Sequence, residues 1–130
     1  MTLGAQAYAT TQIQTSSPVQ VIVLLYDGTI QAMKLAQEGI RNNNRDDKAR
    51  FLERALRVVS ELAASLNMEK GGKVATELGR IYEFVIHELT QANLLNQPER
   101  LDAPIRCLSV IRQAWQELAI QIQKPQAANM

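Results

Sequence analysis

Apolar residues recur at intervals of three and four along most of this chain, which is the spacing of amphipathic helices. The first such stretch follows Ser17 and Pro18. Serine is a favourable N-cap, and proline suits the first helical position because its missing N–H would have no partner there. The pattern continues to about Arg41 and stops at the turn-forming run Asn42-Asn43-Asn44. It predicts a helix over residues 18–41, about 36 Å long.

This first helix is apolar around most of its circumference. On a helical wheel, one narrow arc is polar and should face solvent: Gln20, Asp27, Gln31, Lys34, Glu38 and Arg41. Val23 and Leu24 fall within the same arc. A helix with so much apolar surface lies at the centre of a bundle or is covered by something else. In a small protein, the second case indicates a binding surface.

A second helix is predicted after Asp46 or Asp47, either of which could cap it. Its expected core stripe is Leu52, Ala55, Leu56, Val59, Leu62, Ala63 and Leu66. Phe51 and Val58 widen the stripe beyond what one packing partner needs, so we expect both to be partly exposed. Residues 67–72 end in two glycines and are predicted to form a turn.

Two more helices follow. The third is predicted from about Lys73 to Leu95, with core positions Val74, Leu78, Ile81, Val85, Leu89 and Ala92, and a second strip made of Ala75, Gly79, Tyr82, Ile86 and Asn93. The fourth begins at Pro98 or after Asp102, carries Pro104 in its first turn or two, and ends at Lys124-Pro125. Its stripe is Leu108, Ile111, Trp115, Leu118 and Ile122.

Four helices joined by short turns predict an all-α, antiparallel up-down-up-down four-helix bundle over residues 17–124. Residues 1–16 are small and polar apart from a few anchors such as Tyr8 and Ile13, so we expect a flexible N-terminal arm that can rest on the bundle through these two side chains. Residues 125–130 are expected to be a disordered tail.

The amino-acid composition limits the classes of partner that we expect this chain to bind. The 130 residues carry 14 Lys and Arg against 13 Asp and Glu, interspersed, which gives no basic surface for nucleic acid. One cysteine and no recognisable secretory signal indicate a reducing cytoplasm. The longest apolar run, residues 21–26, is far shorter than the ~20 residues of a membrane span, so membrane insertion is not expected.

The sequence predicts no enzyme, metal site or cofactor. It has one histidine, His87, and one cysteine, Cys107, too few for a zinc site of the usual type. Gly71-Gly72-Lys73 lacks the spacing of a phosphate-binding loop. A lone histidine on a four-helix bundle is also typical of phosphotransfer domains, but the neighbouring Glu88 would repel a phosphoryl group. Phosphotransfer is therefore a distant alternative.

Several short motifs occur in an order that resembles a known family, the flagellar export chaperones of the FliS type. They are Ala7-Tyr8, Thr15-Ser16-Ser17-Pro18, Leu24-Leu25-Tyr26-Asp27-Gly28, Leu66-Asn67-Met68-Glu69-Lys70-Gly71-Gly72, Val74-Ala75, Leu78 to Tyr82, Gln91-Ala92-Asn93 and Ala114-Trp115. The resemblance covers roughly residues 7–118. Pro104 departs from the family pattern.

The resemblance implies a bacterial cytosolic chaperone. Such a protein binds the disordered C-terminal segment of flagellin, prevents its premature polymerisation and delivers it to the export gate of the flagellar type III secretion apparatus. The surplus apolar surface agrees with this mechanism, because a disordered amphipathic client can fold onto exposed apolar helix faces.

The residues that we expect to contact partners combine this apolar surplus, the arm and the family motifs. They are Tyr8, Ile13, Ile22, Val23, Leu24, Tyr26, Phe51, Val58, Tyr82, Ile86 and Asn93. The arm would cover part of the client site until a partner displaces it. The alternative is a structural or signalling bundle that buries the same surface in a homodimer.

Overall fold

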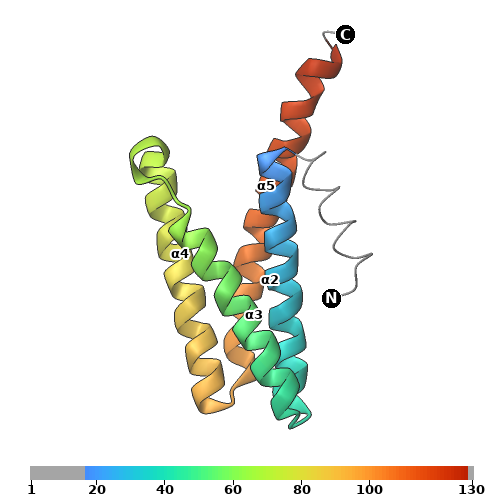
Figure 1. The fold of residues 1–130 in the computed structure, drawn as a ribbon, viewed down its shortest axis with the longest axis vertical. Helices are drawn as coiled ribbons and strands as arrows, with labels where there is room; N and C mark the ends of the chain where they lie inside the picture. The colour runs from blue at the N-terminus through green and yellow to red at the C-terminus, as the bar shows by residue number, and fades with distance from the viewer. Residues whose placement is uncertain (1–16, 129–130) are drawn as a thin grey trace.

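The computed structural model describes residues 17–128, with side chains through residue 122, and these residues are helical almost throughout (Figure 1). The helices are α2 (Pro18–Arg41), α3 (Arg45–Ala64), α4 (Met68–Leu95) and α5 (Asp102–Ala128), with a short 3-10 helix η1 (Pro98–Leu101) before α5. Successive helices run in opposite directions and form a four-helix bundle, as predicted. The predicted arm, with Tyr8 and Ile13, and the last two residues of the predicted tail lie outside the described residues.

Helix α2 begins and ends where the sequence indicated, and it packs against α3, α5 and η1. The Ser17 hydroxyl accepts a hydrogen bond from the Gln20 N–H at 3.2 Å, as expected of an N-cap. At the other end Gly39 permits a close approach to α3, since a Cβ there would lie 2.8 Å from the backbone nitrogen of Lys48. The α2–α3 turn is therefore compact.

The cap predicted for the second helix is wrong. Asn44, not Asp46 or Asp47, is the N-cap of α3, and its side-chain oxygen accepts from the Asp47 N–H at 3.1 Å. The preceding residue, Asn43, takes a left-handed backbone with φ of 54°. Asparagine tolerates that conformation well, so the turn closes in fewer residues than predicted and leaves Asn44 in the capping position.

Helix α4 begins earlier than predicted. Asn67 caps it through a hydrogen bond from the Lys70 N–H at 3.0 Å, so most of the predicted turn is a helical turn. The turn is followed by a break at Gly72, whose φ of 51° and ψ of −126° are not helical. Only glycine adopts such a backbone readily, and the break sets the first turn of α4 apart from the rest of the helix.

The start of the last helix agrees with the prediction, and its end does not. Pro104 lies in the first turn of α5 and is buried, so it does not kink the helix. Helix α5 continues past Pro125 to Ala128. A proline removes one backbone hydrogen bond and does not by itself end a helix, so the predicted end at Lys124 is wrong.

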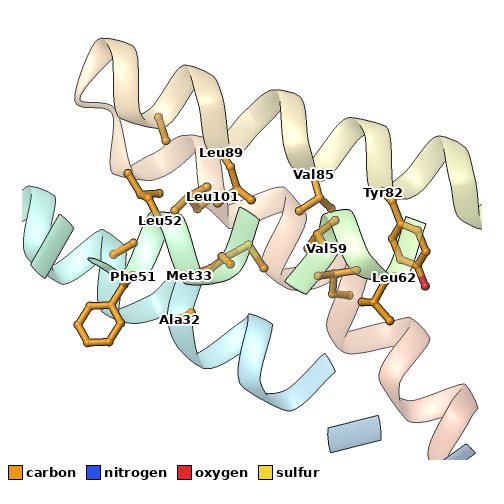
Figure 2. Packing of buried hydrophobic residues seen from close by; sticks show 14 of the residues in the cluster. Ala32, Met33, Phe51, Leu52, Val59, Leu62, Tyr82, Val85, Leu89 and Leu101 are labelled. Atoms are coloured by element: carbon orange, nitrogen blue, oxygen red, sulfur yellow. The ribbon is translucent and has the colours of Figure 1, made fainter. Parts of the chain in front are cut away.

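The core consists of side chains from all four helices and η1. Figure 2 shows part of it as a row between Phe51 and Leu52 at one end and Tyr82 at the other. The predicted core positions are buried or half buried, with four exceptions that are exposed: Leu56, Val74, Leu118 and Ile122.

Helix α2 is long and apolar enough to cross a membrane by length and composition alone. In this structure its buried side contributes Tyr26, Met33 and Ala36 to the core. A central helix of a bundle passes the same test, and the packing of α2 identifies it as that kind of helix.

Candidate functional site

An apolar hollow lies where α3 joins α4. It has a volume of about 240 Å³ and is lined by Ile22, Leu62, Ser65, Leu66, Asn67, Gly71, Val74, Ala75, Leu78, Tyr82 and Trp115. We call it the Trp115 pocket. Its lining comes from all four helices and is mainly apolar, which is the usual character of a site that accepts an apolar side chain.

The pocket exists because the helices separate at this end of the bundle. Helices α4 and α5 make few contacts, and Figure 1 shows the α3–α4 turn set well apart from α5. The break at Gly72 lies in the same region. As a result, Ile22 of α2 and Trp115 of α5 stay only half buried, although both pack against the core.

A polar cluster lies at the inner wall of the pocket. The hydroxyl oxygens of Tyr26 and Tyr82 are 2.6 Å apart, and the two rings meet edge to face with centroids 6.3 Å apart. Burial raises the pKa of Tyr26, and the hydrogen bond with Tyr82 opposes part of that rise. Burial, together with the bond to Tyr26, also raises the pKa of Tyr82. Both phenols are therefore neutral at any ordinary pH.

Trp115 contributes a buried donor. Within the described part of the chain, its indole Nε1 is shielded from solvent and has no partner that meets hydrogen-bond geometry. Desolvating such a donor costs free energy, which is recovered only if an acceptor reaches it. Trp115 thus contributes aromatic surface to the wall of the pocket, while its N–H lies out of reach of solvent.

A second apolar hollow, the α3–α4 groove, lies farther along the same two helices. It has a volume of about 350 Å³ and is lined by Ala49, Leu52, Glu53, Leu56, Leu89, Thr90 and Asn93. Leu56 was predicted to be core, but it is exposed at the edge of this groove. The core stripe of α3 is wider than α2 and α4 together can cover, which leaves Leu56 outside the packed interior.

The structure exposes further large apolar side chains, and all of them except Val74, which lines the Trp115 pocket, lie outside both hollows. They are Leu24, Met68, Val74, Phe84, Leu94, Leu95, Val110, Leu118, Ile120 and Ile122. Val74 is 65% exposed and lies just after the break at Gly72, at the rim of the Trp115 pocket. Leu118 and Ile122 are exposed and belong to the C-terminal half of α5, the helix whose end extends beyond the start of α2 in Figure 1.

Sequence reasoning missed several of these positions. Phe84, Leu94 and Val110 lie off the core stripes of their helices, and Met68 was assigned to a turn. Isolated apolar residues on a polar face are common, so each one alone carries little signal. The signal that could have found them is their number on a chain of this size.

The predicted partner-contact residues fall into three groups. Leu24 and Asn93 are exposed, as a contact residue must be, and Ile22, Val58 and Ile86 are half buried. Tyr82 is buried yet lines the Trp115 pocket, and Asn93 lines the α3–α4 groove. Tyr26 is fully buried beneath Tyr82. Tyr8 and Ile13 lie outside the described residues.

Two expectations of exposure are wrong. Val23 is only 4% exposed, because it lies on the side of α2 that faces α5. Asp27, one turn on, pairs with Arg112 of α5 at 2.8 Å, and Gln37 donates to Asp102 of α5 at 2.8 Å on the same side.

Phe51 is likewise almost buried. The guanidinium carbons of Arg50 and Arg54 lie 4.7 and 5.4 Å from the centroid of its ring. These two side chains therefore cover the part of Phe51 that was predicted to be exposed.

The described residues contain few side chains that are placed for catalysis or metal binding. No group of three or more His, Cys, Asp or Glu side chains within residues 17–122 is placed to hold a metal ion. His87 is exposed and lies 3.9 Å from the Glu88 carboxylate, which is a poor setting for phosphate. The arrangement is one of apolar hollows and exposed apolar side chains, which suits binding.

Comparison with known proteins agrees with a binding role. A family model described as "Flagellar protein FliS" matches residues 1–122. A flagellar secretion chaperone FliS from Salmonella typhimurium is 32% identical over 121 residues, covering 89% of this chain and 90% of the relative. One from Campylobacter jejuni is 33% identical over 116 residues, covering 89% and 91% respectively.

The fold has a solved counterpart as well. A chain described as a flagellar chaperone from bacteria superposes with a TM-score of 0.74 and 19% identity, and the match covers 88% of this chain and 96% of that one. This likeness concerns the fold alone, since the identity is low.

Proposed function

We propose that this chain, which belongs to the flagellar protein FliS family, is a cytosolic secretion chaperone for flagellin. In this proposal it binds the disordered C-terminal segment of flagellin, prevents polymerisation in the cell and hands the subunit to a component of the flagellar export gate. The relatives named above are flagellar secretion chaperones. The role is one of reversible binding, with no chemical step and no cofactor.

The observation that carries the proposal is the Trp115 pocket together with the exposed apolar side chains around the bundle. An unfolded segment with apolar residues at helical spacing can fold as it binds and bury these side chains. A soluble bundle with no such partner rarely leaves this much apolar surface in water. The client would therefore supply the surface that the bundle lacks.

We assign the client contacts to the exposed and half-buried members of the predicted set. Leu24, Val58 and Ile86 would bind apolar side chains of the client, and Ile22 and Tyr82 would contact a side chain inserted in the Trp115 pocket. Val23, Tyr26 and Phe51 would support these contacts from beneath.

The N-terminal arm enters this proposal as a cover. The described chain starts at Ser17, and α2 carries Ile22 of the Trp115 pocket in its first turns, so a 16-residue arm can reach that pocket. Tyr8 and Ile13 would then occupy apolar surface that the client later takes. Deletion of residues 1–16 should raise client affinity or lower solubility, and a deletion that changes neither would contradict the cover.

The direct test is size-exclusion chromatography with light scattering. The full chain would be measured alone and after mixing with a peptide that contains the last 40 or so residues of the flagellin encoded in the same genome. The proposal predicts a complex with the mass of one chain and one peptide. A scrambled peptide of the same composition is the control, and it should leave the elution volume unchanged.

A homodimer that buries the same surface is the competing arrangement. It predicts a free chain that is already dimeric and that takes up no peptide. That result would overturn the chaperone proposal for this chain.

A further inference from the structure

A third cavity lies at the opposite end of α3 from the Trp115 pocket, beside the α2–α3 turn. It has a volume of about 730 Å³ and is lined by Gly39, Ile40, Asn43, Asn44, Arg45, Lys48, Ala49, Asn93 and Asn96. We call it the asparagine cavity. It differs from the two apolar hollows because four amide side chains and two cations dominate its lining.

The charge of this cavity is one-sided. Arg45 and Lys48 line it, and no carboxylate does. The two nearby acidic residues of α3 are not part of the lining, and Asp47 pairs with Arg50 at 3.1 Å. A carboxylate would therefore gain more from Arg45 and Lys48 than a neutral ligand would, and a cation would be repelled.

Arg45 is the more available of the two cations. Lys48 donates to the Asn93 carbonyl at 3.0 Å and to the Asn96 side chain, so it already supports the end of α4. Arg45 is exposed and, among the described residues, forms no ion pair. It also occupies the first position of α3, where the helix dipole disfavours a cation. Its position is unfavourable for the helix and favourable for an anionic ligand.

The asparagine cavity adjoins the α3–α4 groove, because Ala49 and Asn93 line both. A helix bound in the groove along Leu56 and Leu52 would therefore direct one of its ends into the cavity. Only its C-terminal end would suit Arg45 and Lys48, since that end carries the negative end of the dipole and, at a chain terminus, a carboxylate. The groove and the cavity thus fix both the place and the direction of a bound helix.

We propose that the asparagine cavity binds the terminal carboxylate of a client whose last helix lies in the α3–α4 groove. This inference rests on the proposed function, since it assumes a client that presents its own C-terminus. Arg45 forms the ion pair, and the amides of Asn43 and Asn96 lie beside it as further donors. The cavity would thereby distinguish a true chain end from an internal segment of similar sequence.

The test uses one peptide in two forms. The C-terminal flagellin peptide would be synthesised with a free carboxylate and with a terminal amide, and both would be titrated into the full chain by isothermal calorimetry. The free acid should bind about fivefold more tightly than the amide, the scale of one charge-assisted hydrogen bond at a partly solvated site.

Arg45→Gln should abolish that difference by weakening the free acid and leaving the amide unchanged. The matched control is Arg80→Gln, which removes an exposed arginine of α4 that lines none of the three hollows. It should preserve the fivefold preference.

Two results would overturn the inference and leave the chaperone proposal intact. One is equal affinity for the acid and the amide, and the other is an Arg45→Gln variant that still prefers the acid. If the native chain bound neither peptide, both the inference and the proposed function would fall.

Discussion

The phenolic oxygens of Tyr26 in α2 and Tyr82 in α4 lie 2.6 Å apart in the interior, so one buried hydrogen bond joins two helices across the bundle. The bond lies at the wall of the Trp115 pocket, to which Tyr82 belongs. A hydroxyl pair at this place holds the wall of the pocket in one position, and its loss should affect both stability and binding.

Removing both hydroxyls should cost less stability than the two single removals added together. In Tyr82→Phe the buried Tyr26 hydroxyl loses its partner, which should lower the free energy of unfolding by about 1–2 kcal/mol. The double variant with Tyr26→Phe has no unpaired hydroxyl and should lose less than the sum of the two single changes. Urea unfolding of the four proteins measures this, and strictly additive losses would argue against the bond.

The tyrosine pair also predicts a limit at high pH. Burial holds the pKa of both phenols above the unfolded value of about 10, so the folded state keeps protons that the unfolded state releases. The contribution of the pair is thus fully present below pH 10 and is lost as the pH rises above it. The urea midpoint should fall between about pH 10 and 11.5.

The native chain must be compared with the double phenylalanine variant, so that any loss of stability that does not come from the two tyrosines cancels. The double variant should lose less stability over that interval. Parallel curves for the two proteins would show that the tyrosines do not cause the loss.

Two adjacent residues of α2 should respond in opposite ways. Leu24 is 44% exposed, so Leu24→Gln should change the free energy of unfolding by less than about 0.5 kcal/mol and weaken client binding. Val23 is buried, so Val23→Ala should cost about 1–2 kcal/mol in stability. Calorimetric titration with the peptide and thermal unfolding separate the two effects, and full affinity in Leu24→Gln would remove Leu24 from the client site.

The two glycines of α2 offer a matched pair. A Cβ at residue 39 would lie 2.8 Å from the backbone nitrogen of Lys48, so Gly39→Ala should force α2 and α3 apart and destabilise the chain by about 1–3 kcal/mol. A Cβ at residue 28 meets nothing within 4 Å, so Gly28→Ala should stabilise the helix by about 0.5–1 kcal/mol. Thermal unfolding should move the two midpoints in opposite directions.

Local signals in the sequence were enough to predict the helices and most of their ends. Ser17 with Pro18 determines where α2 begins, and Asn96, with φ of 52°, ends α4 through its own tolerance of that backbone. These features depend on a few neighbouring residues. The cap of α3 was mispredicted because three asparagines and two aspartates compete within six residues, and the tightness of the turn decides between them.

The exposure of individual side chains was harder to predict than the helix ends, because it depends on where the helices diverge. Val74 and Leu118 have perfect core spacing and are exposed, since the bundle opens at the end where they lie. Val23 has poor core spacing and is buried, since α5 covers that side of α2. The asparagine cavity was missed for a similar reason. It brings residues of the α2–α3 turn and the start of α3 together with residues of α4 that lie far along the chain. Lys48 and Asn93, for example, are 45 positions apart.

The chain contains a single tryptophan, and that residue lines the pocket to which we assign the client. Indole fluorescence emission depends on the polarity around the ring. The ring of Trp115 is half buried, and a bound client would exclude water from the part that is still exposed. The unmodified protein therefore carries its own optical probe. Client arrival could be followed on the millisecond scale without a label, and the same signal would report whether the arm leaves before the client binds or is displaced by it.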